Sequence, residues 1–180
     1  MCKCFIPYAH AKSLGDIDPN FFVTQGVKTL LVDLDNTLDS YKLFTPTERA
    51  LEVIHKIQAS GIKLVIISNN RGKRVSSYAN AVGVPYIASA RKPFPGAIKR
   101  YIKENNLSLD EVMFVGDQMM TDVLATHNAH VRMVLTEKIV KEDQFTTHFN
   151  RLLDRPIRRH HMKKGHIPEW SDLYGKSTKS

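Results

Sequence analysis

The amino-acid sequence predicts an α/β protein with a doubly wound, mostly parallel sheet of about five strands, flanking helices and no separate cap domain. Short apolar runs, each typical of a buried parallel strand, alternate with segments that show helical spacing of apolar residues. This alternation indicates right-handed strand–helix–strand crossovers, which build a parallel sheet. The 180 residues, 42% of them hydrophobic, are enough for one domain with a substantial core plus tails.

The strands are expected where apolar runs are short and bounded by polar or turn residues. In chain order they are Val27–Leu34, Ile62–Ile67, Val84–Ala88, Val112–Val115 and Val131–Leu135. The intervals after the first two strands are largely taken up by one helix each. They therefore leave no room for a lid domain.

The helices are expected from their start signals and their apolar spacing. Thr45 can cap a helix that has Pro46 at its first position and Glu48 as the second half of a capping box. Ser108 and Glu111 form another possible capping box over a short turn. The remaining helices are expected over Arg71–Val82, from Pro95 to about Asn105, from about Met120 to Asn128, and between Lys141 and Leu153.

Two segments flank the expected central domain, residues 27–153. Residues 1–26 mix aromatic and polar side chains and are expected to form an arm packed on the domain. Contact of this arm with a membrane surface is the weaker alternative. Residues 154–180 begin with a basic stretch that lacks apolar periodicity, which predicts an extended or disordered tail.

The composition favours anionic partners. Lys and Arg number 26 against 18 Asp and Glu, so the formal net charge is +8. Phosphates, nucleic acid or an anionic membrane surface would all suit this charge. Cys2 and Cys4 are too close for a useful disulfide and form no zinc pattern, so we expect a reducing, cytoplasmic location. The sequence also lacks a signal peptide's apolar stretch and any run of the roughly 18 apolar residues that a membrane span needs.

Two carboxylates follow the first expected strand. In TLLVDLDNTL, residues 29–38, the apolar run ends in Asp33 and Asp35. Ligands of open α/β sheets bind at this edge, outside the carboxyl ends of the strands. Neighbouring carboxylates repel each other unless a cation or a proton lies between them, and their hard oxygens suit Mg²⁺. An ordinary turn of Asp, Asn and Thr is the alternative, which D-x-D-x-T alone leaves open.

The next two strand ends carry groups that suit a phosphate. Ser68 offers a hydroxyl, and the backbone N–H groups of Asn69 and Asn70 precede a helix, which would make a phosphate cradle. A helix cap is the alternative for these residues. Lys92, after the third strand, could neutralise a phosphoryl oxygen or a nucleophile, although a solvated surface lysine is the commoner case.

The fourth strand end adds Gly116, Asp117 and Asp122. Gly116 would let the backbone turn tightly and approach a ligand. Asp117 could complete a Mg²⁺ site, and Asp122 could orient a metal-bound water or Lys92. A simple acid at a helix start is an equally good interpretation of Asp122.

The four groups together form a specific pattern. DLDNT, Ser68, Lys92 and GDQMMTD resemble, in this order, the four motifs of the haloacid dehalogenase superfamily, across residues 27–135. The GDQ-x-x-TD form is similar to the class IIIA branch. The N-terminal arm, the short spacing and the KGHIPEW segment are similar to the bacterial YqeG family.

The resemblance implies a Mg²⁺-dependent phosphatase. Asp33 would be the nucleophile that forms an aspartyl-phosphate, and Asp35 the general acid and base. Lys92 would support the phosphoryl charge. Mg²⁺ would bind the Asp33 carboxylate, the Asp35 backbone carbonyl and Asp117, with Asp122 in support.

The resemblance also implies that Thr37, Ser68 and Asn69 hold the phosphoryl group or the loop around it. One stretch departs from the YqeG pattern. DSYK, residues 39–42, stands where an apolar-Pro-Trp stretch is usual in that family. This loop is expected near the entrance of the site, so it bears on substrate preference more than on catalysis.

The expected open site suits a phosphate presented on a large body, because small substrates usually need closure to exclude water. The YqeG family is similar to phosphatases of phosphatidylglycerophosphate, which points to a lipid substrate. The basic tail would then lie on anionic head groups at the inner face of the membrane, at about 1 kcal/mol for each Lys or Arg. A tail that only solubilises the protein is the alternative.

Two other classes of protein are alternatives. A receiver domain of a signalling pathway shares the sheet and the Mg²⁺-binding acids, but its phosphorylated Asp follows the third strand. Here that strand, VPYIASA, has no acid. A non-enzymatic nucleic-acid or ribosome partner would suit the basic tail, yet binding alone does not need the acids, Ser68 and Lys92. Nucleic acid is therefore not the expected partner.

Overall fold

The computed structural model describes the backbone of residues 5–139 and 145–177 and the side chains of residues 5–139 and 154–175. Its centre is a six-stranded sheet in the order β1-β6-β5-β2-β3-β4, with every pairing parallel. The strands are β1 (Ala9–Ala11), β2 (Thr29–Asp33), β3 (Lys63–Ile67), β4 (Tyr86–Ile87), β5 (Val112–Gly116) and β6 (Arg132–Thr136). The doubly wound parallel sheet is confirmed. The additional strand, β1, comes from the segment that the sequence predicts to be an arm.

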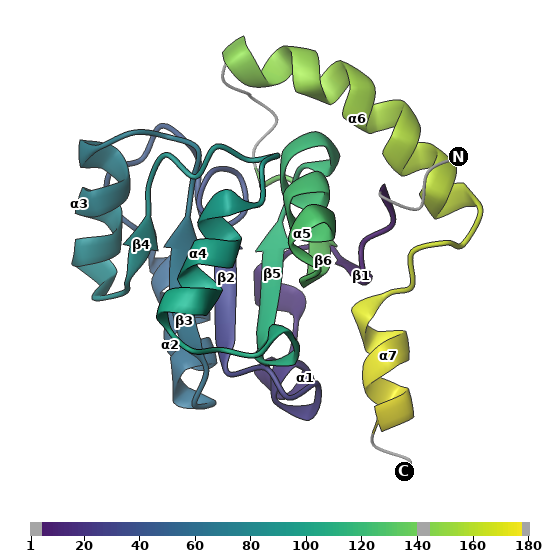
Figure 1. Ribbon diagram of the computed structural model, residues 1–180, viewed down its shortest axis with the longest axis horizontal. Coiled ribbons are helices and arrows are strands. Elements are labelled where there is room, and N and C mark those ends of the chain that lie inside the picture. Colours follow the sequence, from purple (N-terminus) through teal and green to yellow (C-terminus); the bar gives the residue numbers. More distant parts are fainter. Residues whose placement is uncertain (1–4, 140–144, 178–180) are drawn as a thin grey trace.

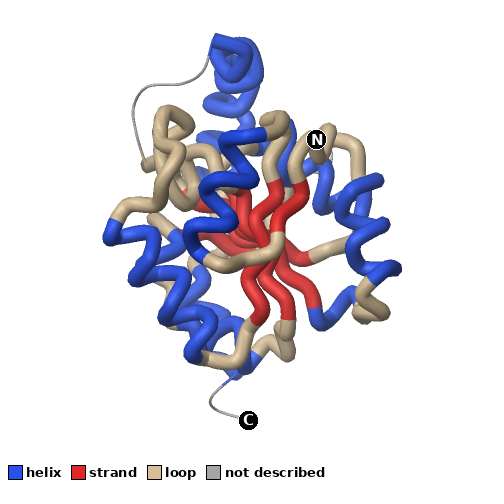
Figure 2. Tube along the Cα trace, turned by 90° about the vertical axis from the view of Figure 1, so that its left-hand side faces the viewer, coloured by secondary structure: helices blue, strands red, loops and turns tan. Residues whose placement is uncertain are grey.

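Helices cover both faces of the sheet (Figures 1 and 2). They are α1 (Pro19–Thr24), α2 (Glu48–Ala59), α3 (Lys73–Val82), α4 (Gly96–Glu104), α5 (Leu124–Ala129), α6 (Phe145–Lys163) and α7 (Trp170–Ser177). Short helical turns are η2 (Leu14–Asp16), η3 (Leu109–Glu111) and η4 (Met119–Val123). In the described part of the chain, α2 and α3 fill the intervals between β2, β3 and β4, and no cap domain is inserted there.

The side-chain alternation of the strands divides the core into two layers. In β2, Leu30 and Val32 pack into the layer that α1, α2 and α3 cover, whereas Leu31 packs into the layer under α4 and α5. Successive residues of a strand point to opposite faces, so a parallel sheet buried on both faces needs an unbroken apolar run. All three of these side chains are fully buried. The core therefore holds the strand ends, and the groups they carry, in fixed positions.

Two of the predicted helix starts can be compared with the structure. The capping box of Ser108 and Glu111 is confirmed. The predicted cap at Thr45 is wrong, because Thr47 caps α2 by accepting the backbone N–H of Ala50 at 3.2 Å. Thr47 is held there by Asp39, which accepts both its backbone N–H and its hydroxyl, at 2.9 Å and 2.8 Å.

The predicted extended tail is wrong for the described residues. A helix is predicted between Lys141 and Leu153, and its first residues, up to position 144, lie outside the described part of the chain. From Phe145 the chain forms α6, which continues through the basic stretch to Lys163. It is followed by α7, where Trp170 contacts Phe21 of α1 with ring centroids 5.7 Å apart. The inward side of α6 carries Asp154, a polar residue, so apolar periodicity could not reveal that side. None of the described helices combines the length and apolar character needed to cross a membrane.

Candidate active site

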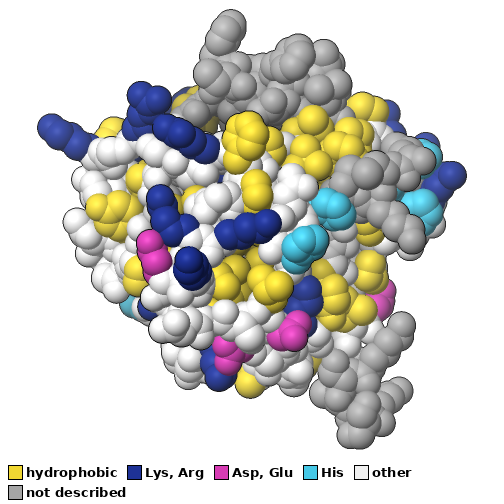
Figure 3. Space-filling view, in the orientation of Figure 1, with side chains coloured by type: hydrophobic (Ala, Val, Ile, Leu, Met, Phe, Trp, Pro, Cys, Tyr) yellow, Lys and Arg dark blue, Asp and Glu magenta, His cyan; other side chains and the backbone are white. Residues whose placement is uncertain are grey.

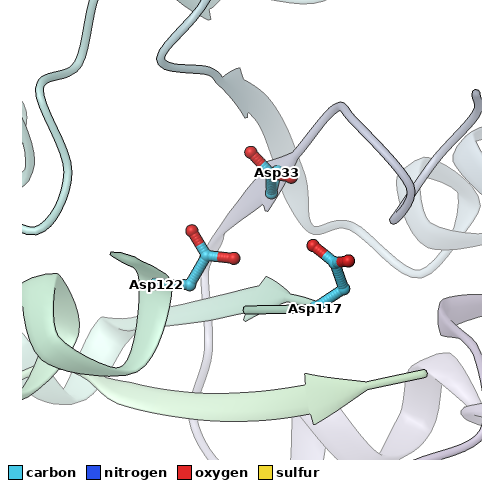
Figure 4. A group of neighbouring side chains, drawn as sticks. All are labelled: Asp33, Asp117 and Asp122. Atoms are coloured by element: carbon cyan, nitrogen blue, oxygen red, sulfur yellow. The ribbon is translucent and has the colours of Figure 1, made fainter. Parts of the chain in front are cut away.

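Asp33 and Asp117 meet where the strand order reverses. Asp33 is the last residue of β2, and Asp117 directly follows β5, the neighbouring parallel strand. The crevice outside the carboxyl ends of two such strands is the usual ligand site of a doubly wound sheet. Asp122, on η4, joins them: one oxygen from each of the three carboxylates lies within 4.8 Å of the others (Figure 4). All three side chains are buried.

Lys92 links two of these carboxylates. Its Nζ lies 2.5 Å from Asp33 Oδ1 and 2.8 Å from Asp122 Oδ1. Burial by itself would lower the pKa of Lys92, but the charges of Asp122 and Asp33 outweigh it and raise this pKa above its ordinary value. Lys92 is therefore a buried ammonium that contacts the predicted nucleophile. Asp122 contacts that ammonium, in agreement with one of the interpretations that the sequence leaves open for this acid.

Three buried carboxylates, those of Asp33, Asp117 and Asp122, lie together in the site. The ammonium of Lys92 contacts two of them, Asp33 and Asp122. Burial raises the pKa of Asp33 well above its ordinary value; Lys92 opposes this shift, and Asp122, Asp35 and Asp117 add to it. A divalent cation among the three carboxylates would oppose this shift and keep Asp33 ionised. The residues present therefore fit a Mg²⁺ ion.

The position of Asp122 depends on a glycine. A Cβ at position 116 would lie 2.5 Å from Asp122 Oδ2 and 2.9 Å from Phe114 Cε1, closer than carbon can approach either atom. The same Oδ2 accepts the backbone N–H of Gln118 at 3.1 Å. Glycine is therefore needed at position 116 because the Asp122 carboxylate occupies the space of a side chain, and not because the backbone turns sharply there. Asp122 therefore lies among the candidate metal ligands themselves, whereas the sequence predicts only a supporting role for it.

Asp35 points into a second polar cluster. Its Oδ1 lies 2.6 Å from Arg74 Nη1, and its Oδ2 accepts hydrogen bonds from Ser68 Oγ at 3.0 Å and Asn70 Nδ2 at 2.9 Å. Arg74 is buried and also donates to the backbone oxygens of Leu43 and Ser40. Arg74 is absent from the predicted site residues. In the sequence it is only one more basic residue at the start of an expected helix.

The three residues predicted to hold the phosphoryl group occupy different environments. Ser68 is fully buried; its hydroxyl group accepts the backbone N–H of Asn70 at 3.0 Å and donates its O–H to Asp35. The side-chain amide of Asn69 exchanges two hydrogen bonds with the backbone of Lys92, at 2.7 Å and 2.9 Å. The buried hydroxyl of Thr37 has no hydrogen-bond partner among the described residues. Asn69 therefore fixes the lysine loop, and the Thr37 hydroxyl is a candidate hydrogen-bond donor to a ligand.

Asp39 organises the loop after β2. Its carboxylate accepts the Tyr78 hydroxyl of α3 at 2.6 Å in addition to its two bonds with Thr47. Burial raises the pKa of Tyr78, and its hydrogen bond to Asp39 adds to this shift, so the phenol remains protonated and donates. The first residue of the unusual DSYK stretch is thus a buried structural link between the loop, α2 and α3.

Helix α6 contacts the loop that carries Asp117 and Asp122. The buried carboxylate of Asp154, on α6, accepts the backbone N–H groups of Met119 and Met120 at 3.1 Å and 2.9 Å. One turn further on, Arg158 donates to the backbone oxygens of Asp117 and Thr136, at 2.7 Å and 2.9 Å. In Figure 1, α6 lies above the carboxyl ends of β5 and β6. The helix is therefore part of the structure that holds this half of the site.

The chain is similar to known hydrolases over most of its length. A model of the haloacid dehalogenase-like hydrolases matches residues 10–136. The chain is 34% identical to "Probable phosphatase YqeG" of Bacillus subtilis (strain 168) over 170 residues, which is 94% of this chain and 98% of that protein. It is 23% identical over 175 residues to "Phosphatidylglycerophosphate phosphatase 1, chloroplastic/mitochondrial" of Arabidopsis thaliana, covering 91% of this chain and 50% of that relative.

Solved structures share the fold at low sequence identity. The 3-deoxy-D-manno-octulosonate 8-phosphate phosphatase from Yersinia pestis has a TM-score of 0.51 and 15% identity, over 67% of this chain and 78% of that one. A protein from Listeria monocytogenes serotype 4b has a TM-score of 0.52 and 12% identity, over 74% and 99%. At these identities the likeness concerns the fold alone.

Proposed function

Because the chain belongs to the haloacid dehalogenase-like hydrolases and is a phosphatase of that type, we propose that it hydrolyses a phosphomonoester with Mg²⁺ bound among Asp33, Asp117 and Asp122. The grouping of three buried carboxylates, with one oxygen of each within 4.8 Å of the others, is the observation that carries this proposal. When bound, Mg²⁺ would neutralise charge on the carboxylates and on the phosphoryl oxygens. The backbone carbonyl of Asp35 would complete the protein's share of the ligands.

The proposed reaction begins with attack of the Asp33 carboxylate on phosphorus. The bond from phosphorus to the ester oxygen breaks, an aspartyl-phosphate forms on Asp33, and the leaving alcohol takes a proton from Asp35. Asp35 then removes a proton from the water that hydrolyses this intermediate. Lys92, 2.5 Å from Asp33 Oδ1, would orient the nucleophile and balance phosphoryl charge.

The phosphoryl oxygens need donors beside the nucleophile. The buried Thr37 hydroxyl, which has no hydrogen-bond partner among the described residues, and the backbone N–H of Asn69 are our candidates for this role. The next amide, that of Asn70, already donates to Ser68 Oγ. Asn69 contributes by fixing Lys92 through its two backbone hydrogen bonds. Arg74 and Asn70 would hold the carboxylate of Asp35 in place between proton transfers.

We further propose that the phosphate is carried by a large or membrane-bound substrate such as phosphatidylglycerophosphate. The distant Arabidopsis relative is named for that lipid, and no cap domain is inserted over the site in the described chain. More basic than acidic side chains lie on the face shown in Figure 3, in line with the net charge of +8. Exposed Met162, Lys163 and Lys164 at the end of α6 would contact an anionic bilayer at the inner face of the membrane.

A phosphatase screen with Mg²⁺ tests this proposal. It should include soluble phosphomonoesters and phospholipid phosphates in vesicles, each with an Asp33→Asn protein as the blank. We expect hydrolysis by the wild type alone, lost when EDTA removes the metal, and fastest on the phospholipid phosphate. Turnover that persists in EDTA would contradict the metal assignment. Preference for a small soluble ester would contradict the substrate class.

A further inference from the structure

A groove begins at Asp117 and runs along α6. One hollow, of about 250 Å³, is lined by Asp117, Glu137 and Arg155, and a second, of about 410 Å³, continues past Arg159 to Met162. The two hollows share Glu137, Arg155 and Arg158 in their linings, so they lie side by side. The groove therefore leads directly away from the candidate metal site.

One wall of the groove carries two exposed guanidinium groups. Arg155 and Arg159 are four residues apart, so they lie one above the other on the same side of α6. Both are exposed, and neither makes a hydrogen bond or an ion pair with any described residue. Glu137 offsets part of their charge. The first hollow has two further acids: Asp117, of the candidate metal site, and Asp154, which already accepts two backbone N–H groups.

The adjacent side of α6, which carries Asp154 and Arg158, fixes the groove relative to the site. Asp154 and Arg158 bind the backbone of the loop that carries Asp117, as described above. Because a helix is rigid over one turn, these contacts also set the distance from the metal site to Arg155 and Arg159. A substrate phosphate at Asp33 would leave the rest of the molecule next to these two side chains.

We propose that this groove, which we call the α6 groove, binds a second phosphate group of the substrate through Arg155 and Arg159. The proposal rests on the proposed function and adds to it the class of substrate: a phosphomonoester that also carries a phosphodiester or a further phosphate. A guanidinium donates two parallel hydrogen bonds to phosphate oxygens, and such charge-assisted bonds are among the stronger ones in proteins. A substrate with one phosphate gains nothing from the groove.

The test compares substrates with one and with two phosphate groups. Glycerol phosphate has one, glycerophosphoglycerol phosphate adds a phosphodiester, and the same head group with acyl chains is presented in phosphatidylcholine vesicles. The variant is R155A/R159A. The matched control is K99A/K103A, which removes the same charge from two exposed residues four apart on α4 that line neither hollow.

The wild type and the control should prefer glycerophosphoglycerol phosphate over glycerol phosphate by at least about tenfold in kcat/KM, the scale of one charge-assisted hydrogen bond. R155A/R159A should lose this preference and still hydrolyse glycerol phosphate normally. Equal losses on both soluble substrates, or equal losses in the control, would overturn the proposal. Dependence on the arginines that appears only with vesicles would also overturn it, because that result would indicate adsorption to a surface.

Failure of the proposed function would be recognised separately. If the wild type hydrolyses none of the three substrates, binding of glycerophosphoglycerol phosphate to the wild-type protein is measured by calorimetry. Affinity about tenfold weaker in R155A/R159A than in K99A/K103A would support the α6 groove without any turnover. Equal affinity in the two variants, or no binding to the wild type, would overturn it.

Discussion

Asp154→Ala tests whether α6 holds the active-site loop. The change removes the acceptor of two backbone N–H groups, that of Met119, which is buried, and that of Met120, which is partly buried. A buried donor left without a partner costs about 1–3 kcal/mol, and the partly exposed donor costs less because water can reach it. We therefore expect the free energy of unfolding to fall by about 2–4 kcal/mol, measured by urea denaturation.

The same change should weaken metal binding. The N–H groups that lose their acceptor lie between Asp117 and Asp122, so the loop that spaces these two carboxylates becomes less ordered. Mg²⁺ affinity, measured by calorimetry, should fall in Asp154→Ala and fall less in Asp154→Asn, which keeps one acceptor oxygen. Asp110→Ala is the control, an exposed acid whose loss should change stability by less than about 0.5 kcal/mol. An Asp154→Ala protein with wild-type stability and wild-type Mg²⁺ affinity would refute the reasoning.

Three further predictions concern the site and its surroundings. Asp35→Asn should keep Mg²⁺ affinity and lower turnover by roughly 10²–10⁴-fold, the usual contribution of proton transfer; a loss of affinity without a turnover defect would contradict the role. Gly116→Ala should lower the free energy of unfolding by about 1–3 kcal/mol, because its Cβ overlaps Asp122; urea denaturation would disprove this by giving wild-type stability. Replacing Lys163 and Lys164 by Glu should weaken sedimentation with anionic vesicles at low salt, and unchanged sedimentation would argue against membrane contact.

The strand ends could be predicted because two simple regularities reinforce each other. Buried parallel strands need apolar runs, and all their carboxyl ends lie at one edge of the sheet. The runs before Asp33 and Asp117 are therefore enough to bring these acids together without any knowledge of packing. Lys92 follows for the same reason, because it lies shortly after β4.

The contacts made by polar side chains could not be predicted in this way. β1 is only Ala-His-Ala and is a strand because it pairs with β6, at the other end of the domain sequence. The buried groups Arg74 and Asp39 satisfy backbone oxygens and hydroxyls of distant segments. Residues of this type have no periodicity of their own, so only the folded structure reveals that they are buried.

The inner side of α6 shows the same limit. Asp154, Arg158 and His161 follow helical spacing, yet they are charged or polar where a docked helix would normally be apolar. Two of them bind backbone groups of the site loop, and Ile157 adds an apolar contact with the core. A basic composition therefore conceals a docked helix.

The most direct test of the central claim is detection of the phosphorylated enzyme. The wild type, the Asp33→Asn variant and an Asp110→Asn control are mixed with Mg²⁺ and a ³²P-labelled phosphomonoester and quenched with acid within one turnover. We expect label on the wild type and on the control, and none on Asp33→Asn. Hydroxylamine should release this label, because it cleaves acyl phosphates. Label on Asp33→Asn, or wild-type turnover with no labelled protein at any time, would contradict Asp33 as the nucleophile.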